Sequence, residues 1–182
     1  MAAVPGLYLL DNIDPMGIPE WLETVRDSAE PVMTPCGRVG KNPRYRLDYG
    51  KKYLTRGTLA DAPDIPPVLA EFLQYCHDTI SAVCGIYDLP DWPPDQCLVN
   101  IYAAGQKIAA HVDHPKHFGG VIFCATFGGR RTMRFTRLGV SHDVVTPPNS
   151  LYVMSEAARY DWTHEMLPSD EDCFSITTRY LK

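Results

Sequence analysis

Two side chains that commonly bind metal ions, His111 and Asp113, lie two positions apart in the sequence. On an extended segment, positions i and i+2 point to the same side, so this imidazole and this carboxylate can meet one ion. A third ligand has to come from elsewhere, and His164 lies on the segment after a predicted strand over 150–154. Two histidines and one carboxylate on one face of an octahedral ion leave three positions open, as in non-haem iron(II) oxygenases. The alternative is a surface loop, with His164 a half-buried histidine that binds no metal.

The segments that must position these residues change in character along the chain. Apolar residues at helical spacing predict helices over 18–28 and 67–84. After residue 96, short apolar runs predict strands, and Gly128-Gly129 is typical of a tight hairpin turn between two of them. Two helices followed by mostly antiparallel strands predict an α+β fold with a jelly-roll core (a double-stranded β-helix) and with the helices packed on one sheet. The predicted strands cover 7–10, 97–102, 121–127, 132–137, 144–145, 150–154 and 173–181.

Length and composition limit the class of protein. The chain has 182 residues, 45% of them hydrophobic and 21% charged, which fits a single globular domain over 1–182. Within it we expect an N-terminal extension over 1–95 and the jelly-roll core over 96–182. The net charge of −5 excludes a strongly basic nucleic-acid footprint. No apolar run approaches the roughly 18 residues of a membrane helix, so we expect no membrane association.

The cysteines and the N-terminus indicate a compartment. The six cysteines are widely scattered, without the paired spacing of a metal-binding or redox motif. The first ten residues lack the basic and long apolar segments of a secretory signal. We therefore expect reduced thiols in a monomeric protein of the cytoplasm or nucleus.

One stretch of the N-terminal part interleaves cations with aromatic side chains. Residues 31–64 have the composition of a loop or an irregular hairpin. Stacking of a base on an aromatic ring is worth about 1–3 kcal/mol, and cations can contact phosphates. The stretch therefore predicts contact with nucleic acid, and the alternative is a solvated, tyrosine-rich loop. Its cations are Arg44, Arg46, Lys51, Lys52 and Arg56, and they lie among Tyr45, Tyr49 and Tyr53.

Several longer motifs resemble one family, the AlkB-like iron(II)/2-oxoglutarate dioxygenases. Residues 100–113, NIYAAGQKIAAHVD, are similar to the family's segment NxY…G…I..HxD. Residues 150–155 and 158–164, SLYVMS and ARYDWTH, are similar to its stretch S-L-x-V-M…A-R-Y…H. The last strand, with SITTR over 175–179, resembles the end of its motif R-x-S-x-T-x-R. The motifs occur in the family's order and cover most of the chain.

The resemblance implies a role for each residue type. His111, Asp113 and His164 would hold iron(II), the site of reaction with dioxygen. The co-substrate 2-oxoglutarate would contact Asn100, Tyr102, Ser175 and Arg179. Residues 38–58 would form a lid that recognises a nucleotide. The substrate-binding residues would be Arg44, Arg46, Tyr49, Lys51, Tyr53 and Arg159.

The last strand departs from the family pattern at one position. The family places an arginine at both ends of this strand face, and the first of them binds the distal carboxylate of 2-oxoglutarate. Cys173 stands at that first position and carries no charge. Loss of a charge-assisted pair costs about 2–3 kcal/mol in a dry site, so another cation should replace it, or 2-oxoglutarate should bind weakly. Arg179 on the same face is the preferred substitute, with Lys107, Arg131 and Arg134 as further possibilities.

The substrate is less well determined by the motifs. Members of the family that repair DNA usually carry another acid just after HxD, and His114 stands there instead. The resemblance therefore favours a base in RNA over one in DNA, as the target of demethylation or hydroxylation. One alternative is a protein side-chain hydroxylase or demethylase of the same fold. Another is a non-catalytic nucleic-acid-binding module whose co-substrate site has degraded.

Overall fold

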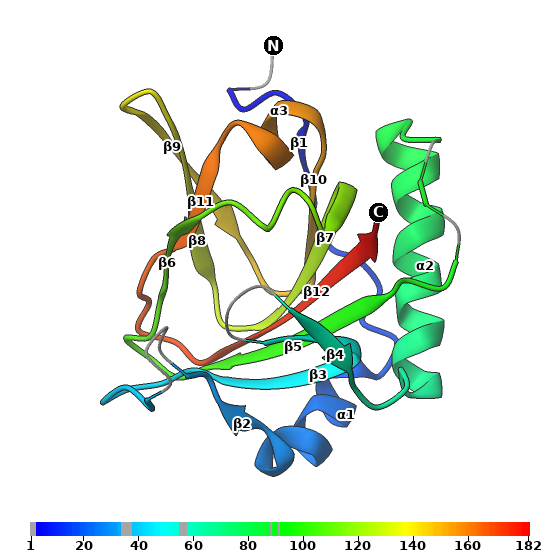
Figure 1. The fold of residues 1–182 in the computed structure, drawn as a ribbon, viewed down its shortest axis with the longest axis vertical. Helices are drawn as coiled ribbons and strands as arrows, with labels where there is room; N and C mark the ends of the chain where they lie inside the picture. The colour runs from blue at the N-terminus through cyan, green and yellow to red at the C-terminus, as the bar shows by residue number, and fades with distance from the viewer. Residues whose placement is uncertain (1–2, 34–37, 55–57, 88, 91) are drawn as a thin grey trace.

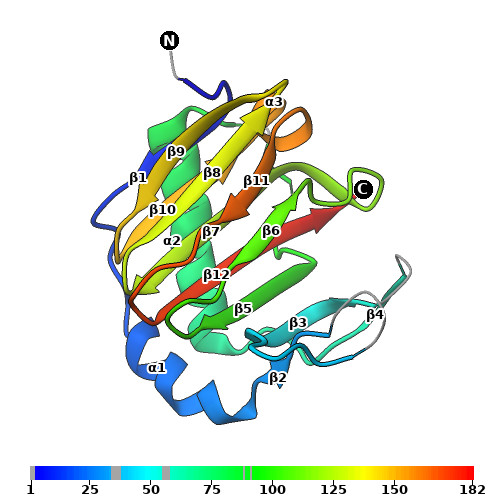
Figure 2. The same cartoon turned by 90° about the vertical axis from the view of Figure 1, so that its left-hand side faces the viewer.

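Two antiparallel sheets face each other in the computed structural model, which describes residues 3–33, 38–54, 58–87, 89–90 and 92–182 (Figure 1). The smaller sheet lies in front of the larger one in Figure 2. This is the jelly-roll arrangement expected from the sequence. In the larger sheet the strand order is β1 (Leu7–Leu10), β10 (Ser150–Met154), β7 (Phe118–Gly128), β12 (Cys173–Leu181), β5 (Gln96–Tyr102), β3 (Tyr45–Tyr53) and β2 (Glu30–Pro31), with β4 (Leu59–Asp61) paired to β3. In the smaller sheet the order is β6 (Ile108–His111), β11 (Thr163–Met166), β8 (Arg131–Arg137) and β9 (Val140–Thr146).

Two N-terminal helices cover the outer face of the larger sheet, as predicted. Helix α1 (Ile18–Val25) continues into a 3₁₀ turn over Arg26–Ser28, and α2 (Pro67–Cys84) runs alongside the sheet (Figure 1). Their apolar faces pack on the odd-numbered residues of β5 and on alternate residues of β7 and β12. The rings of Phe72 and Phe127 meet edge to face, with centroids 5.5 Å apart. A short helix, α3 (Glu156–Tyr160), which the sequence did not predict, lies between β10 and β11.

The alternation of β12 divides its side chains between two environments. Phe174, Ile176 and Tyr180 belong to the helix-covered core. Cys173, Ser175 and Thr177 point the other way, to the interior between the two sheets, because successive strand residues face opposite sides. This interior also contains Tyr102, Met133 and Tyr152, so it is the face on which a site can form.

One predicted feature is wrong, and another is incomplete. The Gly128-Gly129 turn does not close a hairpin, because β7 and β8 belong to different sheets and the chain crosses between them here. The Gly129 amide instead donates to the Asp172 carbonyl at 2.7 Å. The stretch 31–64 does contain an irregular hairpin, since the end of β3 pairs with β4, but residues 45–50 of β3 also pair with β5 and so belong to the larger sheet, which the sequence did not predict. None of the described helices is long and apolar enough to cross a membrane.

Candidate metal and co-substrate site

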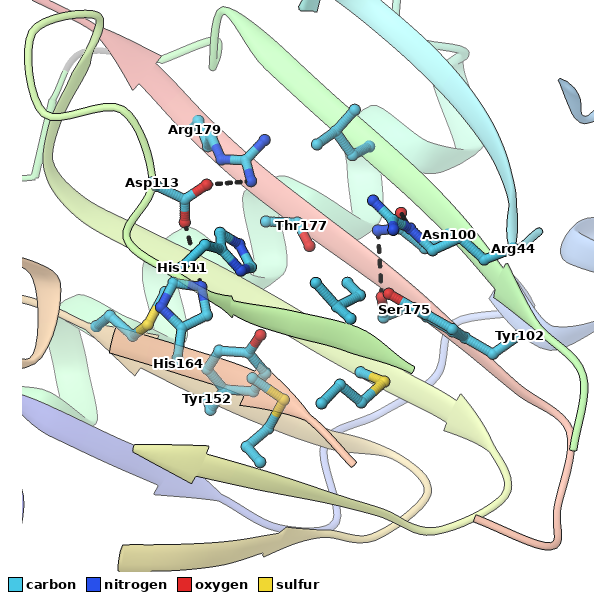
Figure 3. A pocket seen from close by; sticks show the side chains of 15 residues that line it. Arg44, Asn100, Tyr102, His111, Asp113, Tyr152, His164, Ser175, Thr177 and Arg179 are labelled. Carbon is cyan, nitrogen blue, oxygen red and sulfur yellow. Dashed lines mark hydrogen bonds and ion pairs between the residues drawn. The ribbon is translucent and has the colours of Figure 1, made fainter. Parts of the chain in front are cut away.

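Strand pairing brings the three predicted metal ligands together. His111 on β6 and His164 on β11 are direct partners across two antiparallel strands. Asp113 follows two residues after His111, so one short segment supplies two of the ligands. The ligand atoms of the three side chains all lie within 4.8 Å of one another, and Figure 3 shows the side chains converging on one point. The two histidine rings are 4.4 Å apart between centroids. The geometry is that of three ligands around one ion.

Hydrogen bonding orients His111, and burial keeps His164 neutral, as ligands for a metal. Nδ1 of His111 lies 2.8 Å from the Ala109 carbonyl, which suits donation to that oxygen and leaves Nε2 for a metal. His164 is only 6% exposed. Burial, reinforced by the neighbouring His111, lowers the pKa of His164 to about 4. The His164 imidazole is therefore neutral at pH 7 and keeps a lone pair for coordination.

Asp113 is a buried carboxylate whose charge is compensated on one side only. Its Oδ1 accepts a hydrogen bond from Nη2 of Arg179. Its Oδ2 has no hydrogen-bond partner among the residues that the structure describes, and it lies 3.6 Å from Nε2 of His164. Burial alone would raise the pKa of Asp113, but Arg179 and the two histidines hold it below its ordinary value. A buried anionic oxygen without a partner is costly, and a cation bound between Asp113 and the histidines would remove that cost.

A pocket extends from these three residues into the interior between the sheets. Arg179 lies beside Asp113 at the metal end, and Thr177 follows on the same face of β12 (Figure 3). Asn100, Tyr102 and Ser175 lie at the far end. Apolar side chains make up most of the remaining wall: Leu98, Ile108, Met133, Tyr152, Met154 and Met166. The pocket is thus elongated, with polar groups at its two ends.

The far end offers hydrogen-bond donors and no described carboxylate. Nδ2 of Asn100 donates to Oγ of Ser175 at 3.4 Å, across paired positions of β5 and β12. Nε of Arg44 donates to Oδ1 of Asn100 at 3.3 Å. Tyr102 is 1% exposed, and its hydroxyl has no hydrogen-bond partner among the described residues. Burial raises the pKa of Tyr102, so its hydroxyl keeps its proton and can donate. This end of the pocket therefore suits an anionic group.

Comparison with known proteins places the chain in a family. A model of the 2OG-Fe(II) oxygenase superfamily matches residues 20–179. The chain belongs to this superfamily. The chain is 35% identical over 174 residues to the tRNA (carboxymethyluridine(34)-5-O)-methyltransferase alkbh8 of Xenopus tropicalis. The aligned region covers 95% of this chain and 27% of that protein. The "Alkylated DNA repair protein ALKBH8 homolog" of Arabidopsis thaliana is 25% identical over 183 residues, which cover 88% of this chain and 50% of that protein.

A solved structure supports the same fold. The structure of OsALKBH1 superposes with a TM-score of 0.70 at 15% sequence identity, and the match covers 99% of each chain. The chain is therefore an AlkB-like 2OG-Fe(II) oxygenase, an enzyme that uses iron(II), 2-oxoglutarate and dioxygen. The donor set of His111, Asp113 and His164 fits iron(II), and the unpartnered Oδ2 of Asp113 is the group that a cation would satisfy.

We expected Arg159 of this oxygenase to contact the substrate, but the structure places its side chain in the interior. Its side chain is 1% exposed and donates three hydrogen bonds to backbone carbonyls. These carbonyls belong to Asp113, Phe118 and Gly119, at 2.9, 3.2 and 3.0 Å. A guanidinium held in this way cannot reach a substrate. Arg159 instead ties the segment that carries Asp113 to the start of β7.

The residues expected in the nucleotide-recognition lid separate into several environments. Tyr49 is 9% exposed and lies in the helix-covered core, with its ring 6.3 Å from that of Trp21, so it cannot stack on a base. Arg46 pairs with Asp48 at 2.9 Å, and Lys51 pairs with Asp61. Arg44 lines the co-substrate pocket rather than the outer surface. The side chain of Tyr53, and Arg56, lie outside the described residues.

The sequence reasoning missed the position of Arg44 because it depends on a long-range pairing. Arg46 and Asn100 are direct partners between β3 and β5. Side chains two positions apart on a strand share a face, so Arg44 continues the Arg46 side of β3 toward Asn100 and Tyr102. The one available signal was the alternation of Tyr45, Leu47 and Tyr49 with polar residues, which is typical of a half-buried strand.

Proposed function

We propose that this oxygenase oxidises a base in nucleic acid, with RNA favoured over DNA and a modified uridine as the preferred target. The main support for this substrate is the similarity, along 95% of the chain, to a relative that is named for its action on carboxymethyluridine in tRNA. His114, in the position where DNA-repair members usually carry an acid, also favours RNA. The chain spans only part of that relative, so the reaction proposed here is the oxidation that an AlkB-like unit performs.

The pocket supports a two-ended binding mode for 2-oxoglutarate. The keto-acid end would lie at the metal ligands, next to Arg179, and the distal carboxylate would lie near Asn100, Tyr102 and Ser175. Iron(II), with 2-oxoglutarate and dioxygen, supplies the oxidising power that inserts one oxygen atom into a C–H bond of the substrate, while 2-oxoglutarate becomes succinate and carbon dioxide. The apolar wall of the pocket excludes water from this chemistry.

The exposure of the metal ligands indicates where a substrate enters. His111 is partly exposed, whereas Asp113 and His164 are each 6% exposed. A base would therefore approach from the His111 side, over the exposed Ala109 and Ala110 of β6. An extruded or single-stranded base suits such an approach, because a base inside a duplex cannot reach a recessed metal.

The surface of β3 and β4 supplies the cations proposed to contact phosphates. Lys51 and Lys52 are half-buried and pair with Asp61 and Glu30 on the surface. Exposed ion pairs contribute only about 0–1 kcal/mol, so a phosphate can replace the carboxylate at little cost. The acidic partners also limit the net positive charge of this face, which fits a binding site that depends on the base as well as on the phosphates.

The test is co-substrate turnover with a panel of substrates. Purified protein with iron(II) and ascorbate would be given 2-oxoglutarate together with single-stranded RNA carrying 5-carboxymethyluridine or its methyl ester. The same oligonucleotide with plain uridine, a DNA oligonucleotide with N-methylated bases, and a lysine- and proline-containing peptide would serve as comparisons. We expect succinate formation to rise with the modified RNA, and mass spectrometry to show one added oxygen on its modified base.

The comparisons decide between the possible substrates. Stimulation by the methylated DNA alone would replace RNA by DNA. Stimulation by the peptide alone would contradict a nucleic-acid substrate and support the protein hydroxylase alternative. An Asp113→Ala variant should form no succinate with any substrate, which links the signal to this site.

A further inference from the structure

The pocket has one arginine near each end, and only one of them lies beside the proposed metal ligands. Among the described residues that line the pocket, the arginines are Arg44 and Arg179. Arg179 lies beside Asp113 and also donates to Oε1 of Gln96 at 2.8 Å. Figure 3 shows Arg44 at the opposite end, next to Asn100, Tyr102 and Ser175. Because 2-oxoglutarate has a carboxylate at each end, the position far from the metal also needs a cation.

Arg44 has donors available for that carboxylate. Its Nε is used by Asn100, but within the described part of the chain its two Nη atoms donate to no protein acceptor. The Tyr102 hydroxyl is buried beside Ser175 and makes no well-formed hydrogen bond to any described residue. Oγ of Ser175 accepts from Asn100, so its own hydroxyl proton points to another partner and can serve as a donor. Three kinds of donor (guanidinium, phenol and hydroxyl) thus surround one space, and none of the described residues that line this end of the pocket is a carboxylate.

The other arginine in this region is occupied elsewhere. Arg131 is 1% exposed and does not line the pocket. Its guanidinium donates to the carbonyls of Ala103, Gln106 and Glu171, at 3.4, 3.4 and 2.7 Å. It lies behind the Tyr102 ring, 5.5 Å from the ring centroid. Arg131 therefore holds the loops at this end of the sheets together and cannot turn into the pocket without breaking these bonds.

We propose that Arg44, from the N-terminal part of the chain, binds the distal carboxylate of 2-oxoglutarate in place of the arginine that Cys173 lacks. Cys173 is fully buried and uncharged. The cation on that face of β12, Arg179, lies at the metal end, and Arg131 beside Cys173 is held by backbone carbonyls. Arg44, the residue just before β3, reaches the same space from the other side of β5. The specificity for a dicarboxylic 2-oxo acid then depends on a residue outside the jelly-roll segment 96–182. The proposal rests on the co-substrate of the superfamily and not on the choice of nucleic acid as substrate.

A buried glutamine fixes the segment that carries Arg44. Gln106 is 6% exposed, and its Nε2 donates to Oδ1 of Asn42 at 2.9 Å and to the Pro43 carbonyl at 2.6 Å. The Arg44 carbonyl accepts from the Val32 amide at 2.9 Å. These bonds hold the backbone next to Arg44 against the β5–β6 loop. The guanidinium is therefore positioned before any ligand binds, which lowers the entropy cost of binding.

The test compares two ligands that differ only in the distal group. 2-Oxoglutarate and 2-oxopentanoate have the same chain length, but the second ends in a methyl group in place of the distal carboxylate. Both would be titrated calorimetrically, without oxygen, into manganese(II)-loaded wild-type protein, Arg44→Gln and Arg46→Gln. Arg46 is the matched control, because it lies on the same face of β3 but pairs with Asp48 and does not line the pocket.

We expect Arg44→Gln to weaken 2-oxoglutarate binding roughly 10- to 100-fold, the loss of one charge-assisted contact. Its affinity for 2-oxopentanoate should stay within about threefold of wild type, because that ligand presents no charge to Arg44, and this retained binding also shows that the site is folded. Arg46→Gln should bind both ligands like wild type. Unchanged 2-oxoglutarate affinity in Arg44→Gln would overturn the proposal. Equal loss of both ligands would also overturn it, because Arg44 would then be a structural residue.

Discussion

Replacement of the buried Arg159 by methionine should destabilise the protein and weaken its metal site together. The guanidinium donates to the carbonyls of Asp113, Phe118 and Gly119, and methionine can donate to none of them. Two consequences follow. Three carbonyls lose their charged partner in a buried setting, and the segment carrying Asp113 loses its attachment to β7.

The size of the effect follows from the burial and the number of bonds. A hydrogen bond to a charged group contributes about 1.5–3 kcal/mol, but removal of Arg159 also relieves the desolvation of a buried cation. Breaking a buried network by removing one partner typically costs about 3–5 kcal/mol, and we expect Arg159→Met to lower the free energy of unfolding by that amount. For a chain of this length, the melting temperature should fall by roughly 6–20 °C. Loss of a group that orients a metal ligand should weaken metal binding about 10- to 100-fold.

The assay is urea unfolding of the metal-free protein, followed by calorimetric titration of manganese(II) without oxygen. Arg137→Met is the matched control, because Arg137 is 45% exposed and makes one surface ion pair, to Asp161 at 3.3 Å. The control should change stability by no more than about 1 kcal/mol and leave manganese affinity unchanged. The reasoning is refuted if Arg159→Met unfolds at the same urea concentration as Arg137→Met and binds manganese equally well.

Two further predictions concern the co-substrate and the nucleic acid. Cys173→Arg should weaken 2-oxoglutarate binding in calorimetric titration, because Arg44 already supplies the cation and a second guanidinium would crowd a fully buried position; stronger binding would show that no cation serves there at present. Lys51→Gln combined with Lys52→Gln should flatten the slope of log affinity against log salt for single-stranded RNA, by up to about 0.7 per lost phosphate contact. An unchanged slope would show that Lys51 and Lys52 do not contact phosphates and that this surface is simply solvated.

Much of the fold follows from local pattern. Apolar residues at helical spacing predicted α2 over residues 67–84, and the structure has the same bounds. The strands at 150–154 and 173–181 were also predicted with the bounds that the structure shows. In each of these elements the buried face is built from residues that are close in sequence, so the periodicity is visible without knowledge of the partners.

The errors occur where partners are distant in sequence. The tyrosines and cations around residues 45–53 suggested a loop or an irregular hairpin. They did not show that β3 joins the larger sheet, because its partner there, β5, lies some fifty residues later. Gly128-Gly129 suggested a hairpin, because a local turn and a crossing between two sheets have the same composition. For the same reason, the cations that the sequence offers in place of the missing arginine (Lys107, Arg131, Arg134 and Arg179) are all close to core strands, and Arg44 is not among them.

The metal ligands were the most predictable part of the site. The two-residue spacing of His111 and Asp113 and the similarity around His164 predicted all three, and the structure brings their ligand atoms within 4.8 Å of one another. Arg159 and Tyr49 were misplaced, because the sequence shows the chemical type of a side chain but not the side of the element that it occupies. Both side chains are buried, which excludes a contact with the substrate: Arg159 is 1% exposed and Tyr49 is 9% exposed.

The central claim is that His111, Asp113 and His164 together hold one divalent ion. The most direct measurement is anaerobic titration of manganese(II) into wild-type protein and Asp113→Ala, followed by electron paramagnetic resonance of the free ion. Wild-type protein should bind one ion per chain. Asp113→Ala should bind none at the same concentrations while its circular dichroism spectrum stays like that of wild type, because the helix-covered core does not depend on metal. Stoichiometric, tight binding retained in Asp113→Ala would contradict the assignment of this site.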